Sequence, residues 1–498
     1  MMVESNEIEI IRVLSILNPW WEIRSIPDVE RFRRLDFNFL QRRVSDREII
    51  SIVGARQVGK TTLMEQLIDF LLSQNKNTYQ RILMIYGNNT ELNTISENII
   101  KESIDVYEKY VLKEEISKST KRVYVFIDEV QHIKNWFNIV KDYYNINKNI
   151  KFIVSGSSSV KILKDSIKAF VGRAESQIVV PFKFLELLRF NNFQKKRESD
   201  NLMFCSDIPE IRDGLRKLIE SKRVTKKQLN NFFFILEDKF KQMIIFEKTI
   251  KTLLNTYFVK GGYPAVIKEK NQRRCVDTLS SIIRDVINTD IKDTHQIREN
   301  YIMEKLLVLL SKSTSDNVNV AKLSSALESN AKTITEYIGY LEDAFIISTS
   351  ENYRYSQTKR IRKKIKKIYL NDIGLRNVVN NTFIDSILLD PVEMGKIVET
   401  VVHNHCLRLK FKISSQHKSE LFYWRDEQGE VDIVLEHNGK PIPIEVKYKN
   451  KIDENELKNI KRFIKKYGSG FGICVTKDTF ELNGNILMIP TWLFLLIC

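Results

Sequence analysis

The chain has 498 residues, which is too long for one ordinary hydrophobic core and predicts about three or four domains. Its 79 basic and 63 acidic side chains leave a net charge of +16, which suits either an acidic partner such as nucleic acid or a solvated, lysine-rich surface. The five cysteines form no C-x-x-C pair, which argues against a zinc knuckle or a disulfide framework. The acidic start lacks the features of a secretory signal, and the longest apolar run, at 486–498, is too short to span a bilayer. These features predict a cytoplasmic protein, with a buried strand and a short helix at 486–498.

A phosphate-binding motif follows the first predicted strand. Residues 49–53 form a continuous apolar run, as expected for a buried parallel strand. The sequence G-A-R-Q-V-G-K-T-T at 54–62 fits G-x-x-x-x-G-K-[ST], and residues 63–71 then repeat apolar side chains at helical spacing. This order of strand, glycine loop and helix indicates a P-loop rather than a glycine turn that merely precedes a helix.

The composition of this loop predicts a site for ATP. Backbone N–H groups can wrap the phosphates, and the N-terminus of the helix adds favourable partial charge. Lys60 should contact the β- and γ-phosphates and Thr61 should ligate Mg²⁺. The predicted nucleotide-binding residues of the loop are Gly54, Ala55, Arg56, Gln57, Val58, Gly59, Lys60, Thr61 and Thr62, the last of which continues the helix.

A second apolar strand, at 123–129, ends in two carboxylates. Asp128 can hold the Mg²⁺ shell, as the last residue of a Walker B strand does. Glu129 can polarise the attacking water, because in-line attack on the γ-phosphate needs a positioned base. The position of this pair after the P-loop therefore predicts ATP hydrolysis.

These segments together resemble a family of AAA+ ATPases that is common in archaea and also found in bacteria. The resemblance rests on motifs in a fixed order: N-P-W-W at 18–21, the loop at 54–62, F-I-D-E-V-Q-H-I-K-N-W at 126–136, V-S-G-S-S-S at 154–159, V-G-R at 171–173, P-F-K-F-L-E-L at 181–187 and G-G-Y-P at 261–264. Residues 191–245 match least and are interpreted as a variable insertion in a helical lid. In this family the C-terminal domain resembles the restriction-endonuclease-like nucleases.

The resemblance adds further candidates to the nucleotide site. In AAA+ ATPases a polar residue at the end of the third strand, here 151–159, senses the γ-phosphate, so Ser155 and Ser157 are either sensors or caps of a following helix. Arg173 is either an arginine finger, acting within the protein or on a neighbouring copy, or a surface residue paired with Glu175.

A winged helix is predicted after the ATPase. Helical patterns at 299–312, 319–328 and 331–347, the last closing in an apolar strand, follow the helix-turn-helix order. The unit either binds DNA or packs between domains. The residues that would face outward at the recognition position are Thr333, Thr335, Glu336 and Tyr337.

A dense basic run occupies 353–369, where the wing of such a domain would lie. No acidic residue interrupts it, so it could neutralise several phosphates or form the solvated face of a strand, and we favour nucleic acid. Its basic residues are Arg354, Lys359, Arg360, Arg362, Lys363, Lys364, Lys366 and Lys367.

Near the C-terminus, the sequence predicts a hairpin that brings two carboxylates together. Strands at 431–436 and 441–448 flank Asn438-Gly439, the favoured two-residue turn, so cross-strand partners have numbers that add up to 877. Asp432 then lies opposite Glu445, with Cβ atoms roughly 5 Å apart. Such carboxylates repel each other unless a cation lies between them.

This pattern, with Lys447 on the same face as Glu445, resembles the active-site plan of the restriction-endonuclease-like, PD-(D/E)XK nucleases. The resemblance implies that Asp432, Glu445 and the upstream helical Glu399 hold Mg²⁺ or Mn²⁺, and that Lys447 orients or activates water. Val431 stands where that pattern usually has proline. The alternatives are a surface hairpin with unrelated charges and an inactive nuclease-like fold.

The sequence thus predicts an α/β protein with an AAA+ P-loop core, a helical lid, a winged helix and a nuclease-like domain. The expected segments are an N-terminal leader packed on the ATPase at 1–48, the core at 49–185, the lid at 186–298, the winged helix at 299–372 and the nuclease-like domain at 373–498. We expect an Mg²⁺-dependent ATPase that binds nucleic acid, DNA above all, and cleaves it, with homo-oligomers formed through the ATPase domain and no membrane partner. The alternative is an ATP-gated switch or interaction protein.

Overall fold

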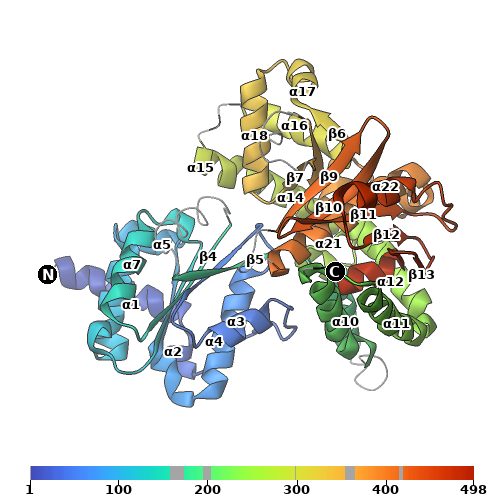
Figure 1. The fold of residues 1–498 in the computed structure, drawn as a ribbon. Coiled ribbons are helices and arrows are strands. Elements are labelled where there is room, and N and C mark those ends of the chain that lie inside the picture. Colours follow the sequence, from blue (N-terminus) through green and yellow to red (C-terminus); the bar gives the residue numbers. More distant parts are fainter. Residues whose placement is uncertain are drawn as a thin grey trace. The chain divides into compact units, whose positions relative to one another are not determined.

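The computed structural model folds into two units, the first comprising residues 1–180 with 343–345 and the second 181–342 with 346–498 (Figure 1). The structure describes residues 2–157, 173–194, 203–221, 223–295, 297, 299–353, 365–413 and 419–498. Within these ranges, no helix combines the length and the apolar character that crossing a membrane requires.

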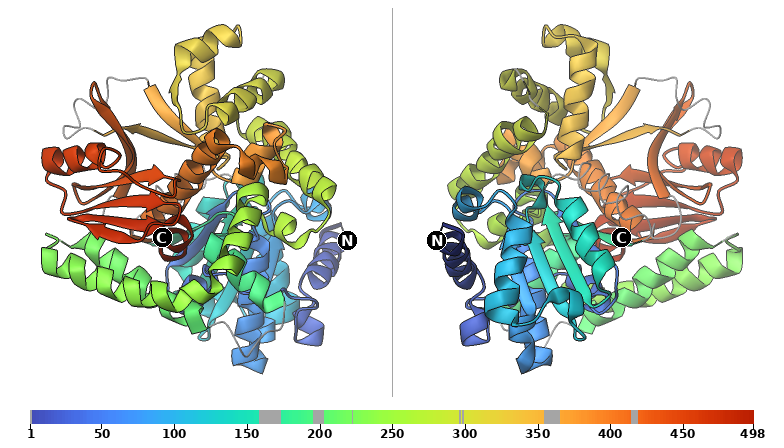
Figure 2. Two further views of the ribbon diagram at one scale, coloured as in Figure 1. Left: turned by 90° about the vertical axis from the view of Figure 1, so that its right-hand side faces the viewer. Right: turned by 90° about the vertical axis from the view of Figure 1, so that its left-hand side faces the viewer.

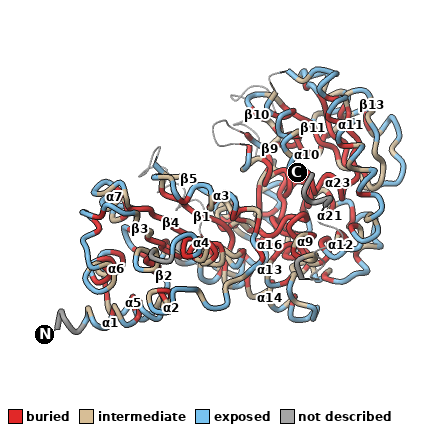
Figure 3. Tube along the Cα trace, turned by 90° about the horizontal axis from the view of Figure 1, so that it is seen from below, coloured by how far each residue is buried: buried red, intermediate tan, exposed pale blue. Residues whose placement is uncertain are grey.

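The first unit is built on a parallel five-stranded sheet with the order β2-β3-β4-β1-β5. Its central strands are buried along their length, as parallel strands covered by helices on both faces must be (Figure 3). The predicted strands of this region are confirmed. The bounds are β1 Ile49–Gly54, β2 Ile82–Tyr86, β3 Val123–Asp128, β4 Ile150–Gly156 and β5 Ala174–Val179.

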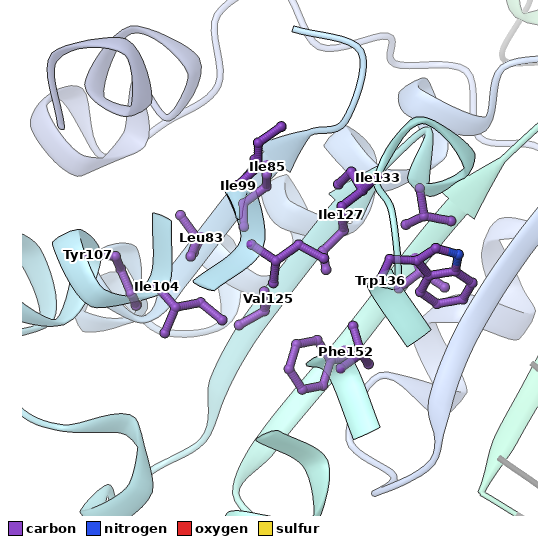
Figure 4. Packing of buried hydrophobic residues seen from close by; sticks show 14 of the residues in the cluster. Leu83, Ile85, Ile99, Ile104, Tyr107, Val125, Ile127, Ile133, Trp136 and Phe152 are labelled. Carbon is purple, nitrogen blue, oxygen red and sulfur yellow. The ribbon is translucent and has the colours of Figure 1, made fainter. Parts of the chain in front are cut away.

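Helices cover this sheet and supply half of its core. Figure 4 shows Ile104 and Tyr107 of one helix packed toward Leu83 of β2 and Val125 of β3, and all four side chains are buried. The helices are α1 Met2–Leu17, α2 Trp20–Ile23, α3 Phe37–Arg43, α4 Lys60–Gln74, α5 Thr90–Ile95, α6 Ile99–Tyr107 and α7 Trp136–Ile146.

The N-P-W-W motif closes the open edge of this sheet. The Asn18 side-chain amide donates to the carbonyl of Met84 at 3.0 Å, and its oxygen accepts from the Met84 N–H at 2.6 Å. The indole N–H groups of Trp20 and Trp21 both donate to the carbonyl of Ile82. Because β2 is an edge strand, these side chains satisfy backbone groups that would otherwise be free to pair with another chain.

The second unit begins with helices, and the long green ones lie along one side of a larger sheet (Figure 2). The segment with the poorest family resemblance contributes two long helices, α10 and α11. The helices before residue 300 are α9 Phe184–Gln194, α10 Met203–Glu220, α11 Lys226–Met243, α12 Glu247–Lys260, α13 Pro264–Lys268, α14 Gln272–Asp285 and α15 Lys292–His295. The helical patterns predicted around 299–347 appear as α16 Asn300–Lys312, α17 Val320–Ala326 and α18 Ala331–Asp343.

One nine-stranded sheet carries the rest of the unit, in the order β13-β14-β12-β11-β10-β9-β7-β8-β6. It crosses the predicted boundary between residues 372 and 373, because β7 pairs in parallel with β9. The strands are β6 Asn317–Asn319, β7 Ile347–Asn352, β8 Ile365–Leu370, β9 Ser419–Asp426, β10 Gly429–His437, β11 Lys440–Lys447, β12 Gly472–Thr476, β13 Glu481–Asn483 and β14 Ile486–Pro490.

Four helices complete this unit. Phe463 of α22 packs on Trp424, Val431 and Val434, while α21 runs along β8 to β11. The strand and helix expected at 486–498 are confirmed as β14 and α23. The helices are α20 Ile373–Val379, α21 Pro391–Ile413, α22 Lys458–Tyr467 and α23 Thr491–Ile497.

The predicted C-terminal hairpin is confirmed. Asn438 and Gly439 both have positive φ angles, of 53° and 76°, as the two-residue turn requires. Ile433 pairs with Ile444, which is the register expected from numbers that add up to 877. A bulge between Val431 and Val434 interrupts the pairing of β10 with β9, next to Asp432.

Candidate ATP site and C-terminal carboxylate cluster

The glycines of the loop at 54–62 are needed for packing and for backbone conformation. A Cβ atom on Gly54 would lie 1.8 Å from the carbonyl oxygen of Val179, because β5 pairs closely beside it. Gly59 has a φ of 94°, in the left-handed region that favours glycine, and helix α4 begins at the next residue. Both glycines therefore hold the loop at the carboxyl end of β1, with the N-terminus of α4 facing it.

Lys60, Thr61 and Asp128 come together at this edge of the sheet. The Thr61 hydroxyl donates to Asp128 Oδ2 at 2.6 Å. The buried Lys60 ammonium donates to the carbonyls of Gly54 and Ala55 at 3.2 and 3.0 Å. The two predicted Mg²⁺ ligands thus lie side by side, and their hard oxygen atoms fit that ion.

Glu129 stands where β3 ends and has a left-handed backbone, with φ 51° and ψ 49°. This conformation costs energy for a non-glycine residue and places its carboxylate 3.9 Å from Lys60. Burial would raise the pKa of Glu129, but Lys60 and a hydrogen bond from Gln131 hold it below its ordinary value. By contrast, burial raises the pKa of Asp128 despite hydrogen bonds from Ser155 and Thr61. The Glu129 carboxylate is therefore ionised at neutral pH and able to accept a proton.

The two predicted serines lie in the same network. The Ser155 hydroxyl donates to Asp128 Oδ1 and accepts from the Glu129 N–H at 3.3 Å. Ser157 accepts from the Gln131 amide at 2.9 Å. Gln131 also contacts the Glu129 carboxylate, so it links the predicted base to the end of β4. Sequence analysis did not single out Gln131, although it lies only two residues after Glu129.

Arg173 is not brought to the phosphate site of its own chain. Its carbonyl accepts from the Ile49 N–H at the start of β1, and the P-loop lies at the other end of that strand, roughly 17 Å away. The alternative pairing with Glu175 is also absent among the described residues, because Glu175 pairs with Arg43 at 3.1 Å and Arg173 donates to Asn145. The place of Arg173 in the sheet therefore argues against a role at the phosphate site of its own chain, and action on a neighbouring copy stays a prediction.

Arg34, which sequence analysis missed, supports the P-loop from the N-terminal segment. It is 6% exposed and donates to the carbonyls of Val58 and Val180, each at 2.7 Å, with Asp36 at 3.5 Å. Its guanidinium group thus ties the loop to the chain just after β5. A single arginine before the first strand carries no periodic or motif signal, so its role emerges only from the fold.

We expect Arg34→Ala to weaken ATP binding about tenfold, because the substitution leaves buried carbonyls unpaired and frees the loop to move. Arg33→Ala is the matched control. The Arg33 side chain is about half exposed, and its guanidinium contacts Asp69 and the Phe37 ring rather than the P-loop. The measurement is the dissociation constant for ATP by titration calorimetry. Equal affinities of the two variants would contradict the assigned role.

The C-terminal hairpin places Asp432, Glu445 and Lys447 together. Asp432 Oδ2 accepts from the Val446 N–H at 2.8 Å, which fixes this carboxylate to the neighbouring strand. The Lys447 ammonium donates to Glu445 Oε1 at 2.6 Å. Glu445 is only 2% exposed, and among the described residues its Oε2 atom has no hydrogen-bond partner. Asp432 and the Glu-x-Lys pair thus occupy adjacent strands on one side of the sheet.

A second buried lysine belongs to this cluster. The Lys367 ammonium on β8 lies 3.1 Å from Glu399, 2.5 Å from Glu430 and 3.8 Å from Asp432. Tyr369 also donates to Glu399, at 2.9 Å. The expectation that Lys367 contacts phosphate as part of the basic run is wrong, since its side chain is 3% exposed. Sequence analysis also missed Glu430 and Tyr369.

The sequence contained a signal for this arrangement. Lys366 and Lys367 are consecutive in a strand, so their side chains must point to opposite faces and one must point inward. Lys366 is the outer one, paired with Glu351 at 3.4 Å.

Crowding perturbs the carboxylates of this cluster. Burial and the nearby Asp432 raise the pKa of Glu399 to about 7 and that of Glu445 to about 8. In the described part of the chain, no three His, Cys, Asp or Glu side chains converge on a geometry that would hold a metal ion. The donor atoms suit a divalent cation, with an unpartnered carboxylate oxygen on Glu445, but Lys367 contacts two of the three predicted ligands.

The predicted nucleic-acid contacts are described only in part. Thr335 and Glu336 on α18 are exposed and Thr333 is half-buried, but Tyr337 is 7% exposed and packs inward, contrary to expectation. The basic residues Arg354, Lys359, Arg360, Arg362, Lys363 and Lys364 lie outside the described residues.

Residues 46–188 match the sequence family described as an AAA domain. The site and this match define the first part of the chain as an AAA-type P-loop ATPase domain. Residues 251–385 and 394–494 match two families described as domains of unknown function, DUF8612 and DUF4143.

The chain is similar over most of its length to two uncharacterised proteins of Methanocaldococcus jannaschii. It is 23% identical to MJ1637 over 478 residues, covering 93% of this chain and 89% of that protein. It is 24% identical to MJ1544 over 470 residues, covering 92% and 84%. Among solved structures, the Aeropyrum pernix ORC2 protein in its ADP form has a TM-score of 0.34 and 14% identity, covering 74% of this chain and 97% of that one. The ORC1 protein of the same organism, in complex with DNA, has a TM-score of 0.30 and 12% identity, covering 73% and 95%.

Proposed function

We propose that the protein is an Mg²⁺-dependent ATPase that acts on nucleic acid. The observation that supports this most is the direct contact between Thr61 and Asp128, with Lys60 and Glu129 beside it. Bound Mg²⁺ would neutralise charge on the phosphoryl oxygens. Lys60 exchanges its contacts with the loop carbonyls for phosphate oxygens, and Glu129 takes the proton of the attacking water. The test is phosphate release by the full chain, with and without single-stranded DNA, duplex DNA and RNA. No release under any of these conditions would overturn the proposal.

Nucleic-acid binding rests on the net charge of +16 and on the basic run at 353–369, apart from the buried Lys367. We propose that the helices α16 to α18 and the strands β6 to β8 form a winged helix. Three helices followed by an antiparallel β7–β8 pair support this layout.

Replacing Arg360, Arg362, Lys363 and Lys364 by Ala should flatten the salt dependence of duplex DNA binding. Each phosphate that is no longer neutralised takes about 0.9 off the slope of log K against log salt. The control replaces Lys226 and Lys227, two exposed lysines of α11, and should leave the slope unchanged. Binding is measured by fluorescence anisotropy at several salt concentrations, and equal slopes in all three proteins would assign the run to a solvated surface.

We further propose that the C-terminal cluster is a metal-dependent nuclease site, with Asp432, Glu445 and Glu399 as ligands. A divalent cation there would generate a nucleophilic water and offset charge on the phosphate. The Lys447 ammonium, which donates a hydrogen bond to Glu445, orients the water that attacks the phosphodiester. The register of β10 and β11 supports this assignment.

A second candidate is an ATP-gated switch whose nuclease-like part binds without cutting. The contacts of Lys367 with Glu399 and Asp432 favour it, because an ammonium group already neutralises part of the cluster. Incubation with single-stranded, duplex and branched DNA and with RNA, in Mg²⁺ or Mn²⁺, distinguishes the two candidates by the presence or absence of products that Glu445→Ala abolishes.

A further inference from the structure

The buried Lys367 has no role in the two sites as proposed. Its position cannot serve nucleic acid, because its side chain is 3% exposed. Burying an ammonium group is costly unless carboxylates surround it, so its position is specified by its partners. These partners are Glu399 and Asp432, two of the predicted metal ligands, together with Glu430.

The charges of the cluster leave room for a further cation. Four carboxylates, on Glu399, Glu430, Asp432 and Glu445, face two ammonium groups, on Lys367 and Lys447, and at Glu430 also the guanidinium of Arg425. If all of these groups are ionised, one negative charge in the cluster has no cationic partner among them.

An independent observation points to a missing partner. Glu445 is 2% exposed, and in the part of the chain that the structure describes its Oε2 atom accepts no hydrogen bond, while Oε1 accepts from Lys447. A buried carboxylate oxygen without a partner is costly, and a cation would satisfy it.

Lys367 has a second place to bind. Glu430 is its nearest partner, and the Glu430 side chain is 27% exposed and also lies 3.6 Å from Arg425. The ring of Tyr423 lies 5.7 Å from the same ammonium. The lysine can therefore keep its contact with Glu430 while it leaves Glu399 and Asp432.

We propose that Lys367 is a built-in counter-cation of the carboxylate cluster, and that a divalent cation binds Glu399 and Asp432 only when the Lys367 ammonium withdraws toward Glu430. This inference rests on the proposed nuclease site and assigns it a competitor for metal. Lys367 holds the cluster together in the metal-free protein and weakens metal binding by occupying two of its ligands.

The test is Mn²⁺ binding to the full chain without nucleotide, followed by electron paramagnetic resonance of the free ion. Binding to the carboxylate cluster is taken as the difference between the Mn²⁺ bound by the wild type and the Mn²⁺ bound by Glu445→Gln. We expect Lys367→Met to lower its dissociation constant at least tenfold, because a positive charge next to two ligands is gone. Lys366→Met, the neighbour on the outer face of β8, is the matched control and should not change the constant.

A second variant gives the opposite expectation. Glu430→Gln removes the partner toward which Lys367 withdraws, so Mn²⁺ should bind about fivefold more weakly than to the wild type. Thermal unfolding shows whether each variant folds. Because Glu430 is partly exposed, Glu430→Gln keeps the inference testable even if Lys367→Met does not fold.

The outcomes separate the inference from the proposed function. If the wild type binds Mn²⁺ at this site and neither Lys367→Met nor Glu430→Gln changes the affinity, the counter-cation inference is overturned and the metal site stands. Weaker binding by Lys367→Met also overturns it, since the lysine would then help to position the ligands. If neither the wild type nor Lys367→Met binds Mn²⁺ at this site, the metal site and the inference both fall.

Discussion

Glu129→Gln should lower the rate of ATP hydrolysis about a hundredfold or more while ATP affinity stays near that of the wild type. The substitution keeps the size of the side chain and removes its ability to accept a proton, and general-base catalysis typically contributes roughly 10²–10⁴-fold. The position of the carboxylate 3.9 Å from Lys60 and its lowered pKa keep it ionised. Steady-state phosphate release and ATP titration measure the two quantities.

Glu65→Gln is the matched control for this prediction. Glu65 lies on α4, and burial together with the charge of Asp128 raises its pKa, so the same chemical change is made in similar surroundings. We expect turnover within about threefold of the wild type. Lys60→Ala serves as the reference for lost ATP binding. Undiminished turnover in Glu129→Gln would assign the base to another residue.

Lys447→Ala should lower the rate of nucleic-acid cleavage about a hundredfold or more, while metal binding is retained. Lys447 donates to Glu445 and is not one of the proposed ligands, so its removal takes away the group that we propose orients water and leaves every carboxylate in place. Asp432→Asn, by contrast, should weaken both metal binding and cleavage and slightly stabilise the metal-free protein, because one of the repelling charges is gone. Cleavage assays and thermal unfolding with and without Mn²⁺ distinguish the two variants.

Lys449→Ala is the control for this second prediction. Lys449 is exposed two residues further on and pairs with Glu456 at 2.5 Å, outside the carboxylate cluster. Cleavage that survives in Lys447→Ala at the level of Lys449→Ala would show that Lys447 has no part in the reaction. Absence of cleavage in the wild type and in both variants would favour the second candidate, a switch that binds without cutting.

The parts of these sites that follow from short-range sequence rules were predictable. The P-loop depends on a fixed spacing after a buried strand, and the C-terminal hairpin depends on one Asn-Gly turn that sets the register of every pair after it. The family resemblance added the order of the motifs and the identity of Glu399 as part of the cluster.

The contacts that were missed join segments far apart in the chain. Arg34 donates to the carbonyl of Val180, and Lys367 pairs with Glu430. No periodic pattern in the sequence predicts either contact. Within the basic run, Lys366 and Lys367 have the same chemistry, but they point to opposite faces of one strand. Lys366 is therefore partly exposed, whereas Lys367 is buried. Arg173 shows the converse, because its position in a motif left its role open, and only the fold places it at the start of β1, away from the P-loop.

The parallel pairing of β7 with β9 means that the C-terminal part cannot be excised intact at its sequence boundary. Beside the β7–β9 ladder, the Asn352 side-chain amide donates to the carbonyl of Arg425 and accepts from its N–H, and the Tyr353 backbone N–H donates to the carbonyl of Tyr423. A fragment beginning at residue 373 would lose these partners and expose the backbone of a strand that carries Phe422 and Trp424. Such an unprotected, aromatic-rich edge is a template for intermolecular pairing, so the fragment should aggregate during expression. A fragment beginning at 346 keeps the β7–β9 ladder and, of the sheet, loses only the three-residue edge strand β6.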